Sequence, residues 1–124
     1  MSYLRVDNLS LHFGGLKAVD AVSFEIPQGE IFTIIGPNGA GKTSIFNMIS
    51  RLYEPTTGHL FFEDRDITEV PPHQIASMGI ARTFQNIELF DNASVLSNLL
   101  VGRHCHSRTK LWQEILFMPN LRRA

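Results

Sequence analysis

The chain has 124 residues, of which 44% are hydrophobic and 19% charged, and its formal net charge is −1. This length suits one domain, and folding would bury roughly two thirds of the unfolded surface. The charge balance shows no basic excess that would make nucleic acid the main partner. The single cysteine, Cys105, excludes an internal disulfide and suits a reducing cytosol. No stretch approaches the ~18 apolar residues of a membrane-spanning helix, and the N-terminus lacks a signal-peptide core.

Two strands are expected at the N-terminus. A loosely alternating pattern from Leu4 to Phe13 predicts the first strand, which is broken at Gly14-Gly15. The second strand runs from about Ala18 to Ile26 and is followed by a turn at Pro27–Glu30. We expect these two strands to form an antiparallel layer beside the segment that follows.

The next segment carries the most informative motif. Residues Ile31–Ile35 are almost all β-branched or aromatic, which predicts a strand buried on both faces of a sheet. The residues that follow, Gly36–Thr43, fit G-x-x-x-x-G-K-[ST], the phosphate-binding loop. Apolar residues then recur at helical spacing, and we expect this helix to end near Tyr53.

The composition of this loop matches the chemistry of a polyphosphate. Glycines let successive backbone N–H groups approach the anion, and the positive end of the following helix faces the same site. Lys42 would reach the β- and γ-phosphates, and the Thr43 hydroxyl would help to hold Mg²⁺. A glycine-rich turn without a ligand is disfavoured, because strand, loop and helix occur in the required order. The residues expected to line the phosphates are Asn38, Gly39, Ala40, Gly41, Lys42, Thr43 and Ser44.

Short elements are predicted after this helix. His59–Ile67 is expected to form a hairpin with a tight turn at Glu63–Asp66. Pro71-Pro72 predicts the start of a short helix, His73–Met78, which Gly79 closes. Ile80–Phe84 is predicted to be a short strand.

The last part of the chain has a weaker pattern. Ser94 is a good N-cap for a helix that carries Val95, Leu96, Leu99 and Leu100. Thr109–Phe117 is a further candidate helix. A metal site at His104-Cys105-His106 is disfavoured, because adjacent alternating ligands rarely converge on one ion. The basic residues of the tail are better explained as a solvated face than as a lipid or RNA patch: Arg103, Arg108, Lys110, Arg122 and Arg123.

Several segments resemble the ATP-binding subunit of an ABC transporter, over about residues 3 to 101. They are the opening strand at Leu9–Gly15, the family's own form of the phosphate loop at Gly36–Thr43, the hairpin at Gly58–Phe62 with Asp66-Ile67, and the Q-loop at Arg82–Asn86. The sequence of this Q-loop, with Gly79-Ile80-Ala81 before it and Leu89-Phe90 after it, is similar to that of the branched-chain amino-acid importer subfamily. Two positions depart from the family pattern. Asp64 replaces a usual glycine, and Ser97 replaces the acidic residue that often completes a capping box.

The resemblance implies an α/β fold of the P-loop NTPase class (ABC ATPase type), with a mostly parallel core sheet, an N-terminal antiparallel β layer and the start of a helical subdomain. Residues 1–85 would form the N-terminal part of the nucleotide-binding core, and residues 86–124 the truncated start of the helical subdomain. We find no match to the family's Leu-Ser-Gly-Gly signature, Walker B acid, general base or switch histidine. We therefore expect the N-terminal half of such a domain, incomplete and inactive in hydrolysis by itself, and poorly soluble because its strand at residues 31–35 lacks neighbours.

The resemblance also implies roles for individual residues. Phe13 would stack on adenine and Val19 would lie beside the ribose, although both could instead be core residues of the strand layer. Lys42 and Gln85 would be the catalytic residues that this chain supplies. Gln85 would contact Mg²⁺ or the attacking water, because an amide both donates and accepts; the alternative is a solvated loop residue. The apolar residues around it either await a partner or pack under the helical subdomain: Ile87, Leu89 and Phe90.

The implied function is that of an energy-coupling subunit that binds ATP and Mg²⁺. Its partners would be a second nucleotide-binding subunit and integral membrane permease subunits, with no nucleic acid. The permease would hold it at the cytoplasmic face of the inner (plasma) membrane. Import of branched-chain amino acids is the leading expectation, and urea importers and lipid or lipopolysaccharide exporters use similar ATPases. Two alternatives stay open: a truncated, non-catalytic nucleotide-binding fragment, and an unrelated P-loop kinase, which Arg82–Asn86 disfavours.

Overall fold

The computed structural model describes residues 2–84 and 89–103. The chain divides into two compact units, Met1–Thr83 and Phe84–Ala124, and each is described by itself. Several sequence predictions fall outside the described residues. They are the domain boundary at residue 85, the roles of Gln85 and Ile87, the rejected metal site at residues 104–106 and the candidate helix at residues 109–117.

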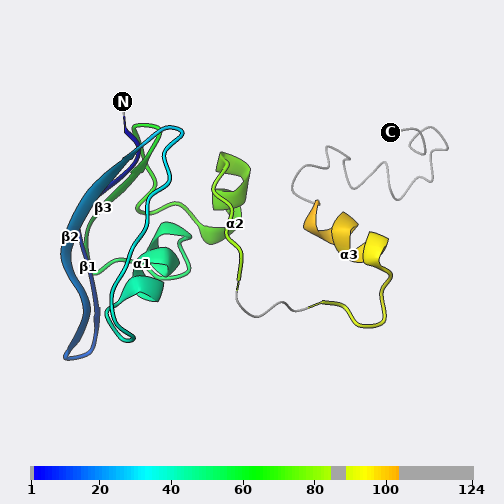
Figure 1. Ribbon diagram of the computed structural model, residues 1–124, viewed down its shortest axis with the longest axis horizontal. Coiled ribbons are helices and arrows are strands. Elements are labelled where there is room, and N and C mark those ends of the chain that lie inside the picture. The colour runs from blue at the N-terminus through cyan, green and yellow to red at the C-terminus, as the bar shows by residue number, and fades with distance from the viewer. Residues whose placement is uncertain (1, 85–88, 104–124) are drawn as a thin grey trace. The chain divides into compact units, whose positions relative to one another are not determined.

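The first unit is built on a four-stranded antiparallel sheet with the order β2-β1-β3-β4 (Figure 1). β1 (Ser2–Phe13) and β2 (Leu16–Pro27) form a long hairpin in which Val6 lies opposite Phe24. Gly14 stands in the turn between them with a φ of +57°, a conformation that glycine adopts without steric cost. The antiparallel layer predicted from the alternating pattern is confirmed.

A second, shorter hairpin extends the sheet on the other side of β1. β3 (Thr57–Phe62) pairs with β1, and β4 (Arg65–Asp66) pairs with β3. The two turn residues between them, Glu63 and Asp64, have φ values of 49° and 61°, and positive φ at both positions is what a type I′ turn requires. The predicted hairpin is confirmed, and aspartate at residue 64 adopts the left-handed conformation that its short polar side chain tolerates.

One face of the sheet carries the hydrophobic core. α1 (Lys42–Ile49) packs against this face, and α2 (Pro72–Ile75) adds one side chain to the core (Figure 1). Burying a side chain of this kind stabilises a fold by about 1.5–3 kcal/mol. This packing therefore fixes the helix that follows the phosphate loop to the sheet. The buried core residues are Val6, Leu9, Leu11, Val19, Ile45, Met48, Leu60, Phe62, Ile67 and Ile75.

The short helix α2 ends as the sequence predicts. It continues into a 3₁₀ turn, η1 (Ala76–Met78), and Gly79 follows with a φ of +99°. The Gly79 N–H donates to the Ala76 carbonyl at 3.1 Å, which satisfies one of the last carbonyl groups of the helix. The predicted helix and its closing glycine are confirmed, with the last turn tightened.

The predicted strand at Ile31–Ile35 is not formed. Residues 31–37 belong to no strand or helix, and Ile31 and Ile35 are 98% and 86% exposed. In this segment Ile34 packs against the core. A strand requires neighbours that bond its N–H and C=O groups, and within residues 2–84 and 89–103 no strand pairs with this segment. Composition alone therefore predicted a strand whose partners the described chain does not supply.

Two further predictions differ from the structure, one for a strand and one for the end of a helix. Residues 80–84 form no strand, for the same lack of a pairing neighbour among the described residues. α1 ends at Ile49 rather than near Tyr53. Arg51 adopts a left-handed conformation with a φ of 59°, which takes the chain out of the helix earlier than the apolar spacing indicates.

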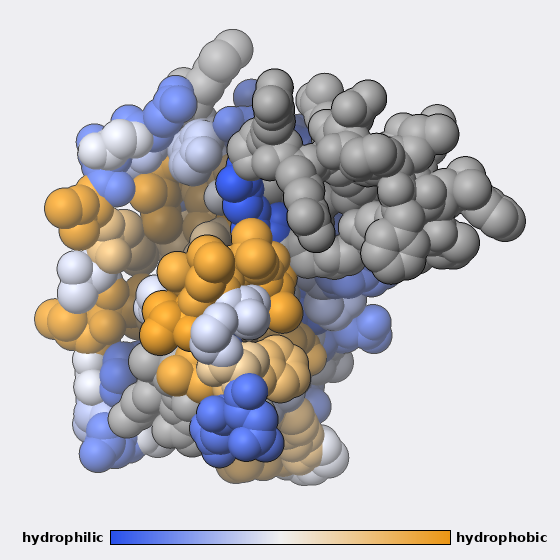
Figure 2. Space-filling model, turned by 90° about the vertical axis from the view of Figure 1, so that its right-hand side faces the viewer, coloured by the Kyte–Doolittle hydropathy of each residue, from blue (hydrophilic) through white to orange (hydrophobic). Residues whose placement is uncertain are grey.

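The second unit contains α3 (Val95–Gly102). The Ser94 hydroxyl oxygen accepts from the Ser97 N–H at 3.1 Å, so the predicted N-cap is confirmed. The Ser97 hydroxyl lies 2.9 Å from the Ser94 hydroxyl, where a capping box would place a carboxylate. Apolar residues along α3 are exposed, and apolar surface (orange) is prominent in Figure 2. Among the described residues, no helix is both long enough and apolar enough to span a membrane.

Candidate functional site: a phosphate-loop pocket

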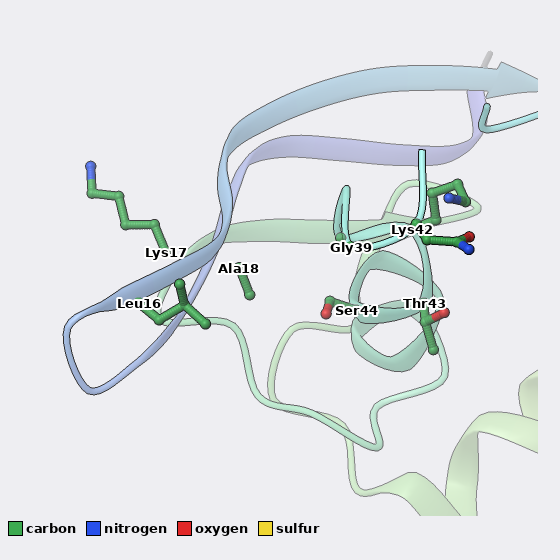
Figure 3. Close-up of a pocket in the computed structure, with 9 residues that line it drawn as sticks. Leu16, Lys17, Ala18, Gly39, Lys42, Thr43 and Ser44 are labelled. Carbon is green, nitrogen blue, oxygen red and sulfur yellow. The ribbon is translucent and has the colours of Figure 1, made fainter. Parts of the chain in front are cut away.

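A pocket of 330 Å³ lies between the start of β2 and the start of α1 (Figure 3). The loop that precedes α1 forms one side of it, and the end of the β1–β2 hairpin forms the other. Most of the lining residues are those that the sequence predicts to bind phosphate. The lining consists of Leu16, Lys17 and Ala18 from β2, with Asn38, Gly39, Gly41, Lys42, Thr43 and Ser44 from the loop and helix.

Glycine shapes the loop at this pocket. Gly39 and Gly41 have φ values of +84° and +82°, in the left-handed region that favours glycine. A Cβ atom at Gly41 would lie 2.4 Å from the Ala18 carbonyl oxygen and 3.2 Å from a Val19 methyl group. The Ala40 N–H donates to the Pro37 carbonyl at 3.2 Å and closes a turn within the loop. The loop can therefore approach β2 this closely only because residue 41 has no side chain.

The N-terminus of α1 opens directly after this loop. Its first intrahelical bond runs from the Ile45 N–H to the Gly41 carbonyl at 3.0 Å. The N–H groups of Lys42, Thr43 and Ser44 consequently have no acceptor inside the helix, and no side chain among the described residues caps this end. Free N–H groups and the positive end of the helix dipole favour an anion. The pocket therefore fits a phosphate group.

The Lys42 side chain bonds to its own loop. Its Nζ donates to the carbonyl oxygens of Gly36 at 2.7 Å and Pro37 at 2.6 Å. Both acceptors are neutral, and hydrogen bonds between two ionised groups are shorter and stronger than those to a neutral acceptor. These bonds keep the ammonium at the loop, where a polyphosphate would be the stronger partner for it.

The chain offers hydroxyl groups, rather than a cluster of carboxylates, to a metal at this pocket. Thr43 is exposed and Ser44 is half-buried in the first turn of α1. In the described part of the chain, no three His, Cys, Asp or Glu side chains are grouped as metal ligands. Mg²⁺ commonly keeps several waters and is held by few protein oxygens together with phosphate oxygens, so the Thr43 hydroxyl fits that role.

Three of the predicted nucleotide contacts do not line the pocket: Ala40, Phe13 and Val19. Val19 is 5% exposed and belongs to the hydrophobic core. Phe13 is half-exposed and packs edge-to-face against Tyr53, with ring centroids 5.5 Å apart. Their roles beside adenine and ribose stay predictions. The same holds for Gln85, which lies outside the described residues.

The sequence patterns did not indicate the three β2 residues that line the pocket. Lys17 lines it, but its side chain points away from the loop (Figure 3), and its Nζ donates to the Asp20 carboxylate at 3.1 Å. Its place two residues after the Gly14-Gly15 turn is a signal that could have indicated this position. The Ala18 carbonyl lies where a side chain at Gly41 would begin, and no pattern of side chains reveals that backbone contact.

The ABC transporter family pattern matches residues 19–123. The chain is 46% identical over 121 residues to the high-affinity branched-chain amino acid transport ATP-binding protein LivG of Salmonella typhimurium, covering 98% of this chain and 48% of that protein. It is 46% identical over 102 residues to the probable branched-chain amino acid transport ATP-binding protein LivG of Archaeoglobus fulgidus, covering 82% of this chain and 40% of that protein.

Solved structures agree with these sequence relatives. The ADP conformation of MJ1267, an ATP-binding cassette of an ABC transporter, has a TM-score of 0.77 and 35% identity, covering 96% of this chain and 46% of that chain. A nucleotide-free ATP-binding cassette from an ABC transporter has a TM-score of 0.67 and 32% identity, covering 85% and 47%. The chain therefore belongs to the ABC transporter family, and the predicted ABC ATPase fold class is confirmed. It spans about half the length of the relatives that it matches.

Proposed function

We propose that the chain binds ATP with Mg²⁺ in the phosphate-loop pocket, as the nucleotide-binding part of a subunit that energises import of branched-chain amino acids. One observation carries the proposal: the Gly41 loop delivers the free N–H groups of α1 to a pocket that Lys42 and Thr43 also line. The naming of the relatives as branched-chain amino acid transport proteins supports the choice of solute.

Each residue has a role in this proposal. The loop and helix N–H groups cradle the phosphates, and Lys42 leaves the carbonyls of Gly36 and Pro37 to neutralise the β- and γ-phosphates. The Thr43 hydroxyl is a ligand for Mg²⁺, whose chemistry is to offset the phosphate charge. Phe13 contacts the adenine, and Gln85 contacts the metal or the attacking water. Val19 lies beside the ribose, and its methyl group borders the space that a side chain at Gly41 would need.

ATP hydrolysis needs more groups than ATP binding does. Phosphoryl transfer needs a positioned water and stabilisation of the charge that develops, in addition to a phosphate cradle. This chain supplies the cradle, Lys42 and Gln85. We propose that it binds nucleotide by itself without turning it over, and that turnover requires the signature and Walker B residues for which no match occurs among its 124 residues.

Partners and location follow from the same proposal. A second nucleotide-binding subunit would close over the ATP, and permease subunits would hold the assembly at the cytoplasmic face of the plasma membrane. Residues 1–85 would act as the nucleotide-binding part, and residues 86–124 as the beginning of the helical subdomain.

Titration with a fluorescent ATP analogue tests the binding proposal. We expect Lys42→Ala to weaken affinity by at least about tenfold, because it removes a charge-assisted contact. Lys110→Ala removes the same side chain elsewhere and should change affinity less than about twofold. Equal affinities for wild type and Lys42→Ala would overturn the proposed function. Steady ATP hydrolysis that Lys42→Ala abolishes would overturn the claim that the chain only binds.

A further inference from the structure

The aromatic ring that we propose to contact adenine is paired with a second aromatic ring. Phe13 is the last residue of β1, and Tyr53 lies four residues after the end of α1. Their ring centroids are 5.5 Å apart and their ring planes differ by 81°, which makes an edge-to-face pair. Both residues belong to the first unit, so the contact is part of one compact body.

Phe13 stands beside the phosphate-loop pocket. It pairs across the β1–β2 hairpin with Leu16, which lines that pocket. Phe13 is 49% exposed. Because the two ring planes are nearly perpendicular, Tyr53 leaves at least one face of the Phe13 ring uncovered. An uncovered aromatic face is a surface on which a nucleobase can stack. The position of Phe13 therefore suits a base whose phosphates lie in the pocket.

The backbone of Tyr53 is held at the end of α1. Its N–H donates to the Asn47 carbonyl at 3.1 Å. Its carbonyl accepts from the Arg51 Nη1 at 3.5 Å. The Arg51 guanidinium is itself fixed, because the residue is buried and its Nε donates to the Val70 carbonyl at 3.1 Å. Tyr53 is therefore attached to the helix whose first turn lines the phosphate-loop pocket.

Three residues after Tyr53, the chain is attached to β1. The Thr56 N–H donates to the Ser10 carbonyl at 2.8 Å, and the His12 N–H donates to the Thr56 hydroxyl at 2.9 Å. The segment is thus fixed on both sides of Tyr53, at α1 on one side and near the end of β1 on the other. Because the backbone is already ordered, placing the Tyr53 ring against Phe13 costs little additional conformational entropy.

A fixed partner matters for a half-exposed ring. A phenylalanine at the end of a hairpin has several staggered rotamers available to it. Rotamer freedom that is lost on binding weakens affinity, and a contact that removes this freedom beforehand strengthens it. Edge-to-face packing against Tyr53 favours one orientation of the Phe13 ring.

We propose that Tyr53 is a positioning residue for the adenine, which acts by holding the ring of Phe13. This inference rests on the proposed function. It adds that the contribution of the base to ATP affinity depends on the Phe13–Tyr53 pair, whereas the affinity of the pocket for the phosphates does not.

The test compares the affinities of ATP and of inorganic triphosphate, measured with the full chain by displacement of a fluorescent ATP analogue. The ratio of the two affinities isolates the contribution of the nucleoside, because a change in the phosphate loop alters both. We expect Phe13→Ala to reduce this ratio by about tenfold, the size of one stacked base. Tyr53→Leu keeps apolar bulk and removes the ring, and it should reduce the ratio by about threefold. The double variant should lose no more than Phe13→Ala alone, because Tyr53 acts through Phe13.

Three controls separate positioning from a loss of structure. Tyr53→Phe retains the ring and should keep the ratio within about twofold of wild type. Tyr3→Leu is the matched control, because Tyr3 makes an edge contact with Phe62 at 4.8 Å near the start of β1, and it should leave the ratio unchanged. If Tyr53→Leu lowers the thermal midpoint of unfolding, Tyr53→Met, whose flexible side chain fills irregular gaps, is measured in the same comparison.

Several outcomes would overturn the inference while the proposed function stands. They are a ratio for Tyr53→Leu and Tyr53→Met equal to that of Tyr3→Leu, a further loss in the double variant, and an equal loss of affinity for ATP and triphosphate in both Tyr53 variants. A wild-type chain that binds triphosphate as tightly as ATP would also overturn it, because the base would then contribute nothing. An ATP affinity that is insensitive to Lys42→Ala would overturn both.

Discussion

Gly41 meets the backbone of Ala18 so closely that a Cβ atom at Gly41 would lie 2.4 Å from the Ala18 carbonyl oxygen. The contact joins the phosphate loop to β2 immediately before α1 begins. Gly41 therefore serves the fold and the pocket together: its left-handed φ turns the chain into the helix, and its missing side chain lets the loop touch the sheet.

Gly41→Ala should damage both stability and binding. The left-handed backbone and the clash with Ala18 together are expected to cost about 2 kcal/mol or more, and moving the loop away from β2 should also weaken ATP binding. The measurement is a urea unfolding midpoint together with a nucleotide titration. Gly15→Ala is the matched control, since no atom of the described residues lies within 4 Å of a Cβ there. A Gly41→Ala chain as stable as the Gly15→Ala chain would contradict this account.

Arg51 should stabilise the fold through its buried guanidinium. The residue is 5% exposed, and its Nε donates to the Val70 carbonyl at 3.1 Å. Arg51→Ala removes a charged hydrogen bond in a buried setting, and we expect a loss of about 2–3 kcal/mol in the free energy of unfolding. Its ion-pair partner Glu54 is 88% exposed at 4.0 Å, so Glu54→Gln should cost less than about 0.5 kcal/mol. Similar losses for the two variants would show that the ion pair, rather than the Val70 contact, matters.

Asp66 should make stability depend on pH in the acid range. The Thr68 hydroxyl and N–H, and then His59, hold the pKa of this carboxyl below its ordinary value. The Thr68 N–H donates to Asp66 at 2.8 Å, and the His59 Nδ1 lies 3.2 Å from the carboxylate. A lowered pKa in the folded state means that the carboxylate stabilises the fold above its unfolded pKa of about 3.9, and that this stabilisation is lost as pH falls through the lower folded value.

Asp66→Asn gives the corresponding measurement. We expect its urea midpoint to lie below that of wild type at pH 6, and the difference between the two proteins to shrink as pH falls below about 4. Asp64→Asn, in the adjacent turn, is the matched control and should show no such convergence, because asparagine adopts the same left-handed conformation. A difference between wild type and Asp66→Asn that is constant from pH 7 to pH 3 would rule out this role.

The exposed apolar segment after β2 should drive self-association. Ile31 and Ile35 are almost fully exposed in a stretch that belongs to no strand or helix, and an exposed apolar stretch of this kind can pair with another chain. The double variant Ile31→Thr, Ile35→Thr should lower the apparent mass in light scattering over a concentration series. Ile34→Thr serves as the contrast: Ile34 packs against the core, so this change should lower stability without reducing association. If the double variant associates as strongly as wild type, residues other than Ile31 and Ile35 form the surface that drives self-association.

Sequence patterns predicted local features best, namely turns and helix ends that depend on the conformation of one or two residues. The Glu63-Asp64 turn, the closing Gly79, the Ser94 cap and the glycine loop before Lys42 each follow from the local needs of a turn or helix end. These features also define most of the pocket, because the phosphate loop is a local motif.

Features that depend on distant partners were not predictable in the same way. A strand at residues 31–35 requires neighbours, and apolar composition gives no information on whether they are present. The pocket wall at Leu16–Ala18 arises from the docking of α1 on the sheet, and the early end of α1 comes from the backbone of Arg51. Each of these is decided by tertiary contacts rather than by residue spacing.

The pairing of β3 with β1 has a consequence for the order of events during folding. Ser10 lies opposite Thr57, and Asp7 lies opposite His59. The stretch between β2 and β3, which includes the phosphate loop, is therefore a long loop whose two ends the sheet brings together. β1 and β2 are consecutive in the sequence and can pair quickly, whereas the pairing of β3 with β1 closes a long loop and is slow. During synthesis the chain therefore forms the β1–β2 hairpin first. We expect it not to bind ATP until β3 has paired with β1.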